Sequence, residues 1–202
     1  MKTTITLFIA LLLLPLNGLA QYKRYHGDGI DDYLQYTPMA TSFILKIAGV
    51  KGKSSWEQRI VKSGATFVLC AGTTYILKHS IHSMRPDGTD NHSFPSGHTA
   101  VAFCGATVLH KEYGKISPWI SVAGYAVATA TALDRVRRNR HHWGDVAAGA
   151  AIGYLSAEAG YWIVDKIMGK KKKKLPDGDI INEEQKVQIG VAADGVAMII
   201  KL

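Results

Sequence analysis

The chain has 202 residues, enough for one domain with a hydrophobic core of its own. Its hydrophobic content of 47% and mean hydropathy of +0.02 are high for a soluble protein and low for one that crosses a membrane many times. The net charge of +8 raises the possibility of a nucleic-acid partner. The apolar segments and an export signal argue against nucleic acid, and the charge suits an anionic phosphate or a membrane surface instead.

Residues 1–20 have the pattern of a secretory signal peptide. Lys2 is their only charged residue, residues 7–16 form an apolar core, and small residues lead up to Gln21. The alternative is an uncleaved signal anchor, although the apolar core is shorter than the roughly 20 residues that a membrane span needs. Export predicts a protein of the bacterial cell envelope.

Helices are predicted for most of the following chain. Residues 21–36 are expected to be irregular, and residues 39–50 form a short apolar helix. The next helix is predicted to begin at Ser54, whose side chain would cap it together with Glu57, and to end near Ser83.

Basic residues lie toward the end of that helix. Lys78, His82 and Arg85 are spaced so that they share one face of a continuous helix. Lys78 and Arg85 are therefore expected to point at one anion. Pro86 disfavours helix at the residue before it, so residues 86–95 are predicted to form a loop.

The sequence Ser96-Gly97-His98 is predicted to open the next helix. Amide groups at a helix start bind anions, and Gly97 lets the backbone approach a phosphate oxygen closely. Ser96 adds a hydroxyl donor, and His98 is placed to give a proton to a leaving oxygen. Taken alone, the same residues indicate only a serine-capped helix.

Further helices are predicted over residues 99–113, 119–133 and 146–168. The two cysteines, Cys70 and Cys104, both fall inside predicted helices. Export would permit a disulfide, but cysteines in mid-helix are more often small buried side chains, so free thiols are favoured.

A dense cationic stretch from residue 134 to 145 separates the last two of these helices. It contains four arginines, two histidines and two aspartates. His141 and Asp145 are four residues apart and can meet across one helical turn, which would fix the imidazole tautomer and leave the other nitrogen free as a nucleophile. Arg135 is a fork-shaped cation suited to phosphate, and His142 misses both spacings by one residue. The alternative is a solvated basic loop.

Three motifs can now be read together: K-x6-R-P from Lys78, P-S-G-H from Pro95 and R-x5-H-x3-D from Arg135. In this order and spacing, the chain resembles the type 2 phosphatidic acid phosphatase (PAP2) family, which shares its pocket with class A acid phosphatases and vanadium haloperoxidases. The resemblance implies an all-α helical bundle with the active site at one end of its core helices. The family usually has serine where this chain has Asp134, so a carboxylate is expected near the phosphate site.

The resemblance also implies roles for individual residues. His141 would attack phosphorus, Asp145 would orient it, and His98 would protonate the leaving oxygen and later activate water. No metal or other cofactor is required, because protein cations surround the phosphoryl group. The residues expected to bind the substrate phosphate are Lys78, Arg85, Ser96, Gly97 and Arg135.

The expected function is hydrolysis of a phosphomonoester, carried by a membrane lipid of the phosphatidate, lipid A or polyprenyl phosphate type. The alternatives are a soluble periplasmic acid phosphatase, a vanadium haloperoxidase and a non-catalytic phosphate-binding protein. Association with the inner membrane and a pocket that faces the periplasm are favoured over a soluble periplasmic protein. With that orientation, a set of basic residues falls on the cytoplasmic side: Arg59, Lys62, Lys111, Lys115 and the lysine run near residue 170.

The predicted organisation after the signal has three parts. Residues 21–169 form the helical phosphatase domain, and residues 170–185 form a lysine-rich linker, either solvated or bound to anionic lipid heads. Residues 186–202 form a C-terminal β-hairpin, because apolar runs flank an Asp-Gly turn signal at Asp194.

Overall fold

The computed structural model describes residues 29–169, 187–192 and 195–200 of the chain. The predicted signal peptide and the lysine-rich linker lie outside these residues. The chain divides into two compact units, one up to Tyr161 and one from Trp162 onward. The predicted site lies wholly within the first unit.

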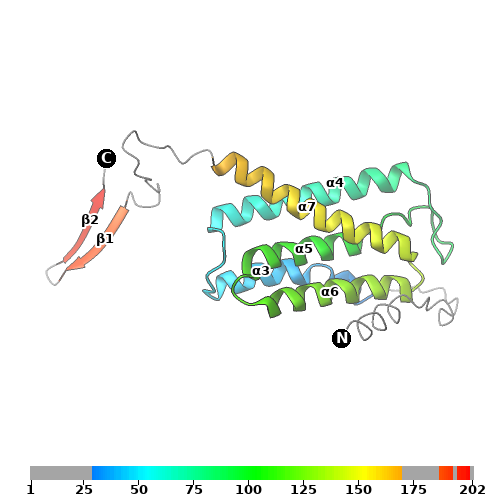
Figure 1. Cartoon of the computed structure of the whole chain (residues 1–202), viewed down its shortest axis with the longest axis horizontal. Coiled ribbons are helices and arrows are strands. Elements are labelled where there is room, and N and C mark those ends of the chain that lie inside the picture. The colour runs from blue at the N-terminus through cyan, green and yellow to red at the C-terminus, as the bar shows by residue number, and fades with distance from the viewer. Residues whose placement is uncertain (1–28, 170–186, 193–194, 201–202) are drawn as a thin grey trace, which may run out of the picture. The chain divides into compact units, whose positions relative to one another are not determined.

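The described part of the first unit is helical, as predicted (Figure 1). The short α2 shows that the segment before residue 36 is not wholly irregular, contrary to the prediction. Helix α5 is central and packs against α3, α4 and α6. The helices are α2 (Asp31–Leu34), α3 (Thr37–Ile47), α4 (Trp56–Ser80), α5 (Gly97–Tyr113), α6 (Pro118–Arg137) and α7 (Trp143–Gly169).

The start of α4 differs by one residue from the prediction. Ser55, not Ser54, is the N-cap, and its side chain accepts a hydrogen bond from Gln58 N at 3.2 Å. Ser54 is buried, and its hydroxyl oxygen accepts a hydrogen bond from Lys62 Nζ at 3.3 Å. The neighbouring serine is therefore the one free to cap the helix.

The end of α4 is also earlier than predicted. The helix stops at Ser80, and Ile81 is extended, so Lys78, His82 and Arg85 do not share a helix face. The following loop folds back on itself, because Ser83 N donates to Asn91 O at 3.0 Å. Arg85 is therefore positioned by this loop and not by the helix.

Small residues let α5 and α7 approach closely. A Cβ atom on Gly153 would lie 2.2 Å from the carbonyl oxygen of Ala100, and one on Gly149 would lie 2.5 Å from that of Ser96. Cys70 and Cys104 pack in the same core as buried free thiols. The helices that carry the second and third motifs are thus held in backbone contact.

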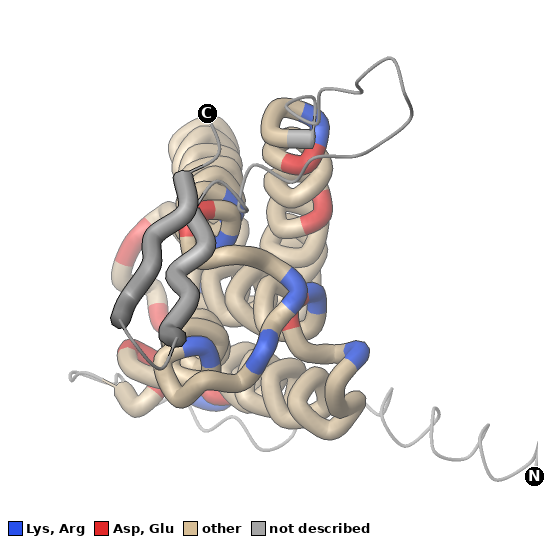
Figure 2. Tube along the Cα trace, turned by 90° about the vertical axis from the view of Figure 1, so that its left-hand side faces the viewer, with Lys and Arg blue, Asp and Glu red and all other residues tan. Residues whose placement is uncertain are grey.

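The four long helices bring their motif-bearing ends together. The C-terminal ends of α4 and α6 and the N-terminal ends of α5 and α7 lie at one end of the bundle, on the right in Figure 1. Figure 2 looks at the opposite end, where lysines and arginines stand out in the near loops. The charged loops and the motifs are therefore separated along the helix axes.

A buried polar network holds the end opposite the motifs. Arg59 donates to Glu112 at 2.7 Å and to the hydroxyl of Tyr113 at 2.7 Å, and Tyr161 donates to Glu112 at 2.8 Å. Arg59 and Glu112 are both fully buried. This network joins α4, α5 and α7 inside the bundle.

Apolar residues occupy the outer face of α4. Phe67, Val68 and Ile76 are 44%, 69% and 64% exposed. Among the helices in the described part of the chain, α4 is the one long and apolar enough to cross a membrane. Polar groups thus face inward and apolar groups outward on this helix.

The described part of the second unit includes two antiparallel strands, β1 (Val187–Ala192) and β2 (Gly195–Ile200). Val187 pairs with Ile200 at the end of the strand pair that is farthest from the predicted turn. The residues that would form the turn, 193–194, lie outside the described part of the chain. The C-terminal hairpin therefore stays a prediction.

Candidate active site

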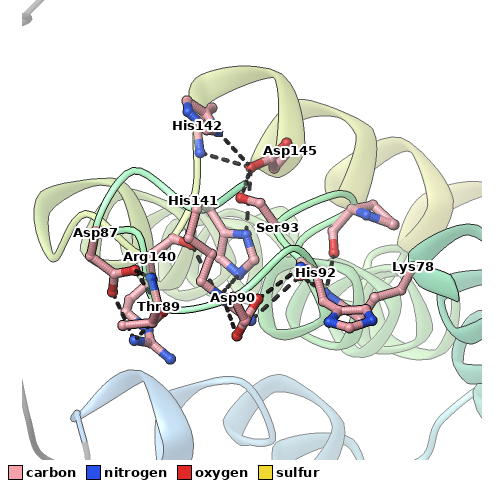
Figure 3. Close-up of polar contacts among 12 residues, drawn as sticks. Lys78, Asp87, Thr89, Asp90, His92, Ser93, Arg140, His141, His142 and Asp145 are labelled. Carbon is pink, nitrogen blue, oxygen red and sulfur yellow. Dashed lines mark hydrogen bonds and ion pairs between the residues drawn. The ribbon is translucent and has the colours of Figure 1, made fainter. Parts of the chain in front are cut away.

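His141 lies in the connection between α6 and α7, with its side chain only 2% exposed. Figure 3 shows His141 below Asp145, and its Nδ1 is 3.6 Å from Asp145 Oδ2. The other ring nitrogen, Nε2, is 3.4 Å from Arg85 Nη1. Because the arginine can only donate, this contact places the neutral ring proton on Nδ1, on the side of Asp145. The Nε2 lone pair then faces the cationic side of the site.

Burial keeps the His141 ring neutral. Desolvation, together with the charges of Arg135, Arg85 and Lys78, lowers the pKa of His141 to about 2, against a smaller opposing contact with the Ser93 backbone. A neutral imidazole keeps the lone pair that a nucleophile needs.

Asp145 is held by more partners than the sequence predicts. The hydroxyl of Ser93 donates to its Oδ2 at 2.5 Å, and the backbone N–H of His142 donates to the same oxygen at 2.8 Å. His142 Nδ1 also lies 3.3 Å away, so His142 reaches Asp145 although it misses the motif spacing by one residue. Asp145 is in the first turn of α7 and reaches back to both histidines.

The two cations of the first motif fix the loop that surrounds the site. Lys78 Nζ donates to the carbonyl oxygens of His92 and Pro95 at 2.8 and 3.0 Å. Arg85 Nε lies 2.8 Å from both carboxylate oxygens of Asp90. Arg85 Nη1 also lies 3.4 Å from His141 Nε2, so residues of the first and third motifs meet in the structure.

Arg135 has a carboxylate partner, but it is not the expected one. Its Nη1 donates to Asp31 of α2 at 2.5 Å, while its buried Nε makes no hydrogen bond within the described residues. Asp134 instead accepts from Nε and Nη2 of Arg137 at 2.9 and 2.6 Å. The other oxygen of Asp134 lies 3.9 Å from Arg138 Nη1, and its expected influence on the phosphate site stays a prediction.

The residues of the second motif open α5, as predicted. Ser96 is its N-cap and is fully buried, and its hydroxyl lies 2.9 Å from that of Thr99. A Cβ on Gly97 would meet only Thr74, at 3.7 Å. Packing therefore does not require glycine at this position, and the space beside the helix start stays open.

His98 contacts α2 as well. Its Nε2 donates to Asp32 Oδ1 at 2.6 Å. Burial and the charge of Arg135 lower the pKa of His98 below 6.5, while Asp32 and Asp31 oppose this shift.

The cationic stretch is not a solvated basic loop. Asn139 adopts a left-handed conformation (φ 55°), which asparagine tolerates, and its carbonyl oxygen accepts from Asp87 N at 3.1 Å. Arg140 pairs with Asp87 at 2.8 Å, and Arg138 contacts Asp31. Carboxylates from other parts of the chain thus balance much of this charge.

Sequence reasoning missed several residues that shape the site. Their common signal is a carboxylate or hydroxyl in a polar segment outside the three motifs, which does not reveal its partner. The missed residues are Asp31, Asp32, Asp87, Asp90 and Ser93.

Together these groups form a cationic site around a buried, neutral imidazole at one end of a helical bundle. Such a site can bind a tetrahedral oxyanion and present a nitrogen nucleophile to it. Fold and site thus define a helical protein equipped for phosphoryl chemistry. The chain belongs to the PAP2 superfamily, whose model matches residues 59–168 and includes all three motifs.

Individual relatives agree with this assignment. The chain is 46% identical over 150 residues to the lipid A 1-phosphatase of Porphyromonas gingivalis, a match that covers 71% of this chain and 34% of the relative. It is 23% identical over 165 residues to lipid phosphate phosphatase gamma of Arabidopsis thaliana, covering 73% of each chain. This chain thus spans about a third of the length of the lipid A 1-phosphatase.

A solved structure has the same fold. The crystal structure of Aquifex aeolicus LpxE matches with a TM-score of 0.51 and 23% identity, over 64% of this chain and 82% of the other. The match extends the family assignment to the arrangement of the helices.

Proposed function

We propose that this protein is a PAP2-type phosphatase that hydrolyses a phosphomonoester carried by a membrane lipid. The observation that carries the proposal is the buried His141 ring, with Arg85 at Nε2 and Asp145 on the side of Nδ1. Binding alone would need no buried neutral nucleophile. The names of two relatives, a lipid A 1-phosphatase and a lipid phosphate phosphatase, support a lipid phosphate as the substrate. The candidates that we propose are phosphates of the lipid A, phosphatidate or polyprenyl type.

Cations of two motifs would hold the phosphoryl oxygens. Lys78 uses two of its three N–H groups on carbonyl oxygens, which leaves one for the substrate. Arg135 offers the buried Nε, and Arg85 lies beside the His141 ring. The Gly97 amide and the Ser96 hydroxyl would complete the oxyanion contacts at the start of α5.

The first chemical step would transfer the phosphoryl group to the enzyme. His141 Nε2 attacks phosphorus, a P–N bond forms, and the P–O bond to the lipid alkoxide breaks. His98 gives its proton to that leaving oxygen. Asp145 stabilises the positive charge that develops on the His141 ring.

The second step would release phosphate. His98, now neutral, takes a proton from water, and the resulting hydroxide attacks phosphorus. The P–N bond breaks, and its electron pair returns to His141 Nε2. Each proton and electron pair is thus accounted for by protein groups and water.

We also propose that α4 holds the protein in the bacterial inner membrane with the site toward the periplasm. The exposed apolar face of α4 supports a lipid environment. Arg59 and Lys62, which were expected at the cytoplasmic surface, are buried inside the bundle. Other lysines are exposed at the end away from the motifs: Lys115, and Lys51 and Lys53 in the loop before α4. This end of the bundle is therefore still basic, which supports a cytoplasmic location for it.

The test is phosphate release by the detergent-solubilised protein from a panel of lipid phosphates and a chromogenic aryl phosphate. We expect hydrolysis that survives a strong chelator and is inhibited by vanadate, which mimics phosphate. His141→Ala should remove the activity. A folded protein that releases no phosphate from any member of the panel would refute the proposal, and a rate that depends on an added divalent ion would refute the mechanism.

A further inference from the structure

Helix α2 lies outside the region that matches the family, yet its side chains contact two groups of the site. Asp32 Oδ1 accepts from His98 Nε2 at 2.6 Å, and Asp32 Oδ2 accepts from the backbone N–H of Gly29 at 3.0 Å. The second bond fixes the carboxylate on its own backbone. Asp32 therefore presents a fixed acceptor to the histidine of the second motif.

The neighbouring carboxylate contacts the arginine of the third motif. Asp31 is fully buried between Arg135 and Arg138, and it accepts from one nitrogen of each. The backbone of Gly29 lies so close that a Cβ atom there would meet Arg138 and Asp31. Helix α2 is thus anchored on the arginines while its next residue reaches His98.

We propose that α2 completes the active site, with Asp32 as a positioning residue that orients His98 and retains a proton on its Nε2, and Asp31 as the residue that positions Arg135. This inference rests on the proposed phosphatase function and adds residues to it. It assigns a role in proton transfer to α2, which lies outside the region that matches the family model.

The hydrogen bond determines which ring nitrogen moves the proton. Protonated His98 carries N–H at both nitrogens, and Nε2–H remains on Asp32. Nδ1 then gives its proton to the leaving alkoxide and later takes one from water, while the Nε2 proton stays in place. A carboxylate that fixes one imidazole nitrogen in this way sets the tautomer needed for both steps.

The same three side chains raise the question of a metal ion, because ligand atoms of Asp31, Asp32 and His98 lie within 4.8 Å of one another. Both oxygens of Asp31, however, face guanidinium groups. Two adjacent positive charges oppose a third cation. The geometry therefore favours a hydrogen-bonded network of α2 with the site.

The charged groups that face His98 determine the sign of the pH effect. These are Asp32 and Asp31 on α2 and Arg135 on α6. The carboxylates favour the protonated ring, and Arg135 disfavours it. Loss of the Asp32 charge therefore lowers the pKa of His98 further, and the acid form needed for leaving-group protonation is lost at lower pH.

The experiment is the pH dependence of kcat/KM for Asp32→Asn, Asp32→Glu and wild type, on a lipid phosphate. In wild type, kcat/KM is expected to fall at higher pH as His98 loses its proton, and we call this fall the alkaline limb. In Asp32→Asn we expect the alkaline limb to lie about one pH unit lower, with a loss of about tenfold in kcat/KM at neutral pH. Asp32→Glu keeps the negative charge, so its alkaline limb should lie close to that of wild type. Glu57→Gln serves as the matched control, because Glu57 is an exposed carboxylate in the first turn of α4, at the end away from the site.

A second readout separates positioning from a merely structural role. A nitrophenyl phosphate has a good leaving group that needs little protonation, whereas a lipid alkoxide needs a full proton. Asp32→Asn should therefore reduce kcat/KM much more for the lipid phosphate than for the aryl phosphate. With an active wild type, two results would overturn the inference. One is an equal loss of kcat/KM for the lipid phosphate and the aryl phosphate in Asp32→Asn, and the other is an alkaline limb at the wild-type pH. An inactive folded wild type would instead refute the proposed function itself.

Discussion

Two adjacent histidines, His141 and His142, lie within reach of Asp145, and burial distinguishes them. The His141 side chain is 2% exposed and the His142 side chain is 54% exposed. His141 alone has its second ring nitrogen beside Arg85. We therefore propose His141 as the nucleophile from the environment of its ring, because both histidines contact the carboxylate.

Substitution of each histidine tests this assignment. His141→Ala should reduce kcat by about a thousandfold or more, because no other neutral ring faces Arg85 in the described site. His142→Ala should keep activity within about tenfold of wild type, since it removes one exposed side-chain contact and retains the backbone N–H bond to Asp145. Steady-state phosphate release measures both, and the reverse order of effects would contradict the register of the third motif.

The pH dependence of the wild type tests the proposed role of His98 as proton donor. The pKa of His98 lies below 6.5 because burial and Arg135 disfavour its charged form. The proton that it must donate is thus lost in the acid range, so kcat/KM should fall as pH rises through that range. His141, with a pKa of about 2, should add no acid limb above pH 4, about two units higher. A profile of kcat/KM that rises steadily from pH 5 to pH 9 would contradict this role of His98.

At the scale of elements, the contact between α5 and α7 positions the site. Helix α5 begins at the residue before His98, and α7 begins two residues after His141. Gly149 and Gly153 let the two backbones touch near these starts. The distance between the proton donor and the nucleophile therefore depends on small residues that have no chemical role.

Gly153→Ala tests this dependence. The new methyl group would lie 2.2 Å from the Ala100 carbonyl oxygen and 2.8 Å from Cys104 N, so α7 must shift. We expect a loss of stability of about 1–3 kcal/mol and a lower kcat, measured by thermal unfolding in detergent and by phosphate release. Gly72→Ala is the control, because its Cβ would meet nothing within 4 Å, and it should change neither property adversely. Equal effects of the two substitutions would show that close packing at Gly153 is not required.

At the scale of the molecule, the first unit combines a polar interior with an apolar outer face on α4. The fully buried Arg59–Glu112 pair is shielded from water, and exposed apolar side chains such as Val68 face outward. In a bilayer this arrangement satisfies the buried charges internally and gives the apolar face a matching solvent. It therefore supports the proposed membrane location.

Cell fractionation tests that location. The protein should sediment with membranes, resist extraction with carbonate and enter solution with detergent, because the apolar face of α4 would otherwise meet water. Replacement of outward-facing Val68 and Ile76 by lysine should weaken this retention. Recovery of the wild type in a periplasmic extract without detergent would favour the soluble acid phosphatase alternative.

The helical class, the family and the residues of the three motifs could be predicted from the sequence. Each motif is local, and local spacing carries its own physical meaning: a serine-capped helix start before His98, and a histidine four residues before an aspartate. The predicted helices from residue 99 onward agree with the structure to within a few residues. Helix ends were less predictable, because capping depends on which serine hydroxyl is engaged elsewhere: that of Ser54 contacts Lys62, and that of Ser55 caps the helix.

Which charged side chains form pairs could not be predicted from the sequence, because the pairs depend on how the helices pack. Asp31 and Asp32 lie more than 60 residues from their partners Arg135 and His98, and no local spacing links them. Asp134, adjacent to Arg135 in sequence, turns away to Arg137 because successive helical residues point in different directions. The chemical groups of the site are thus visible in the sequence. Their partners depend on the packing of α2 against α5 and α6, because ion pairs form between groups that are close in space.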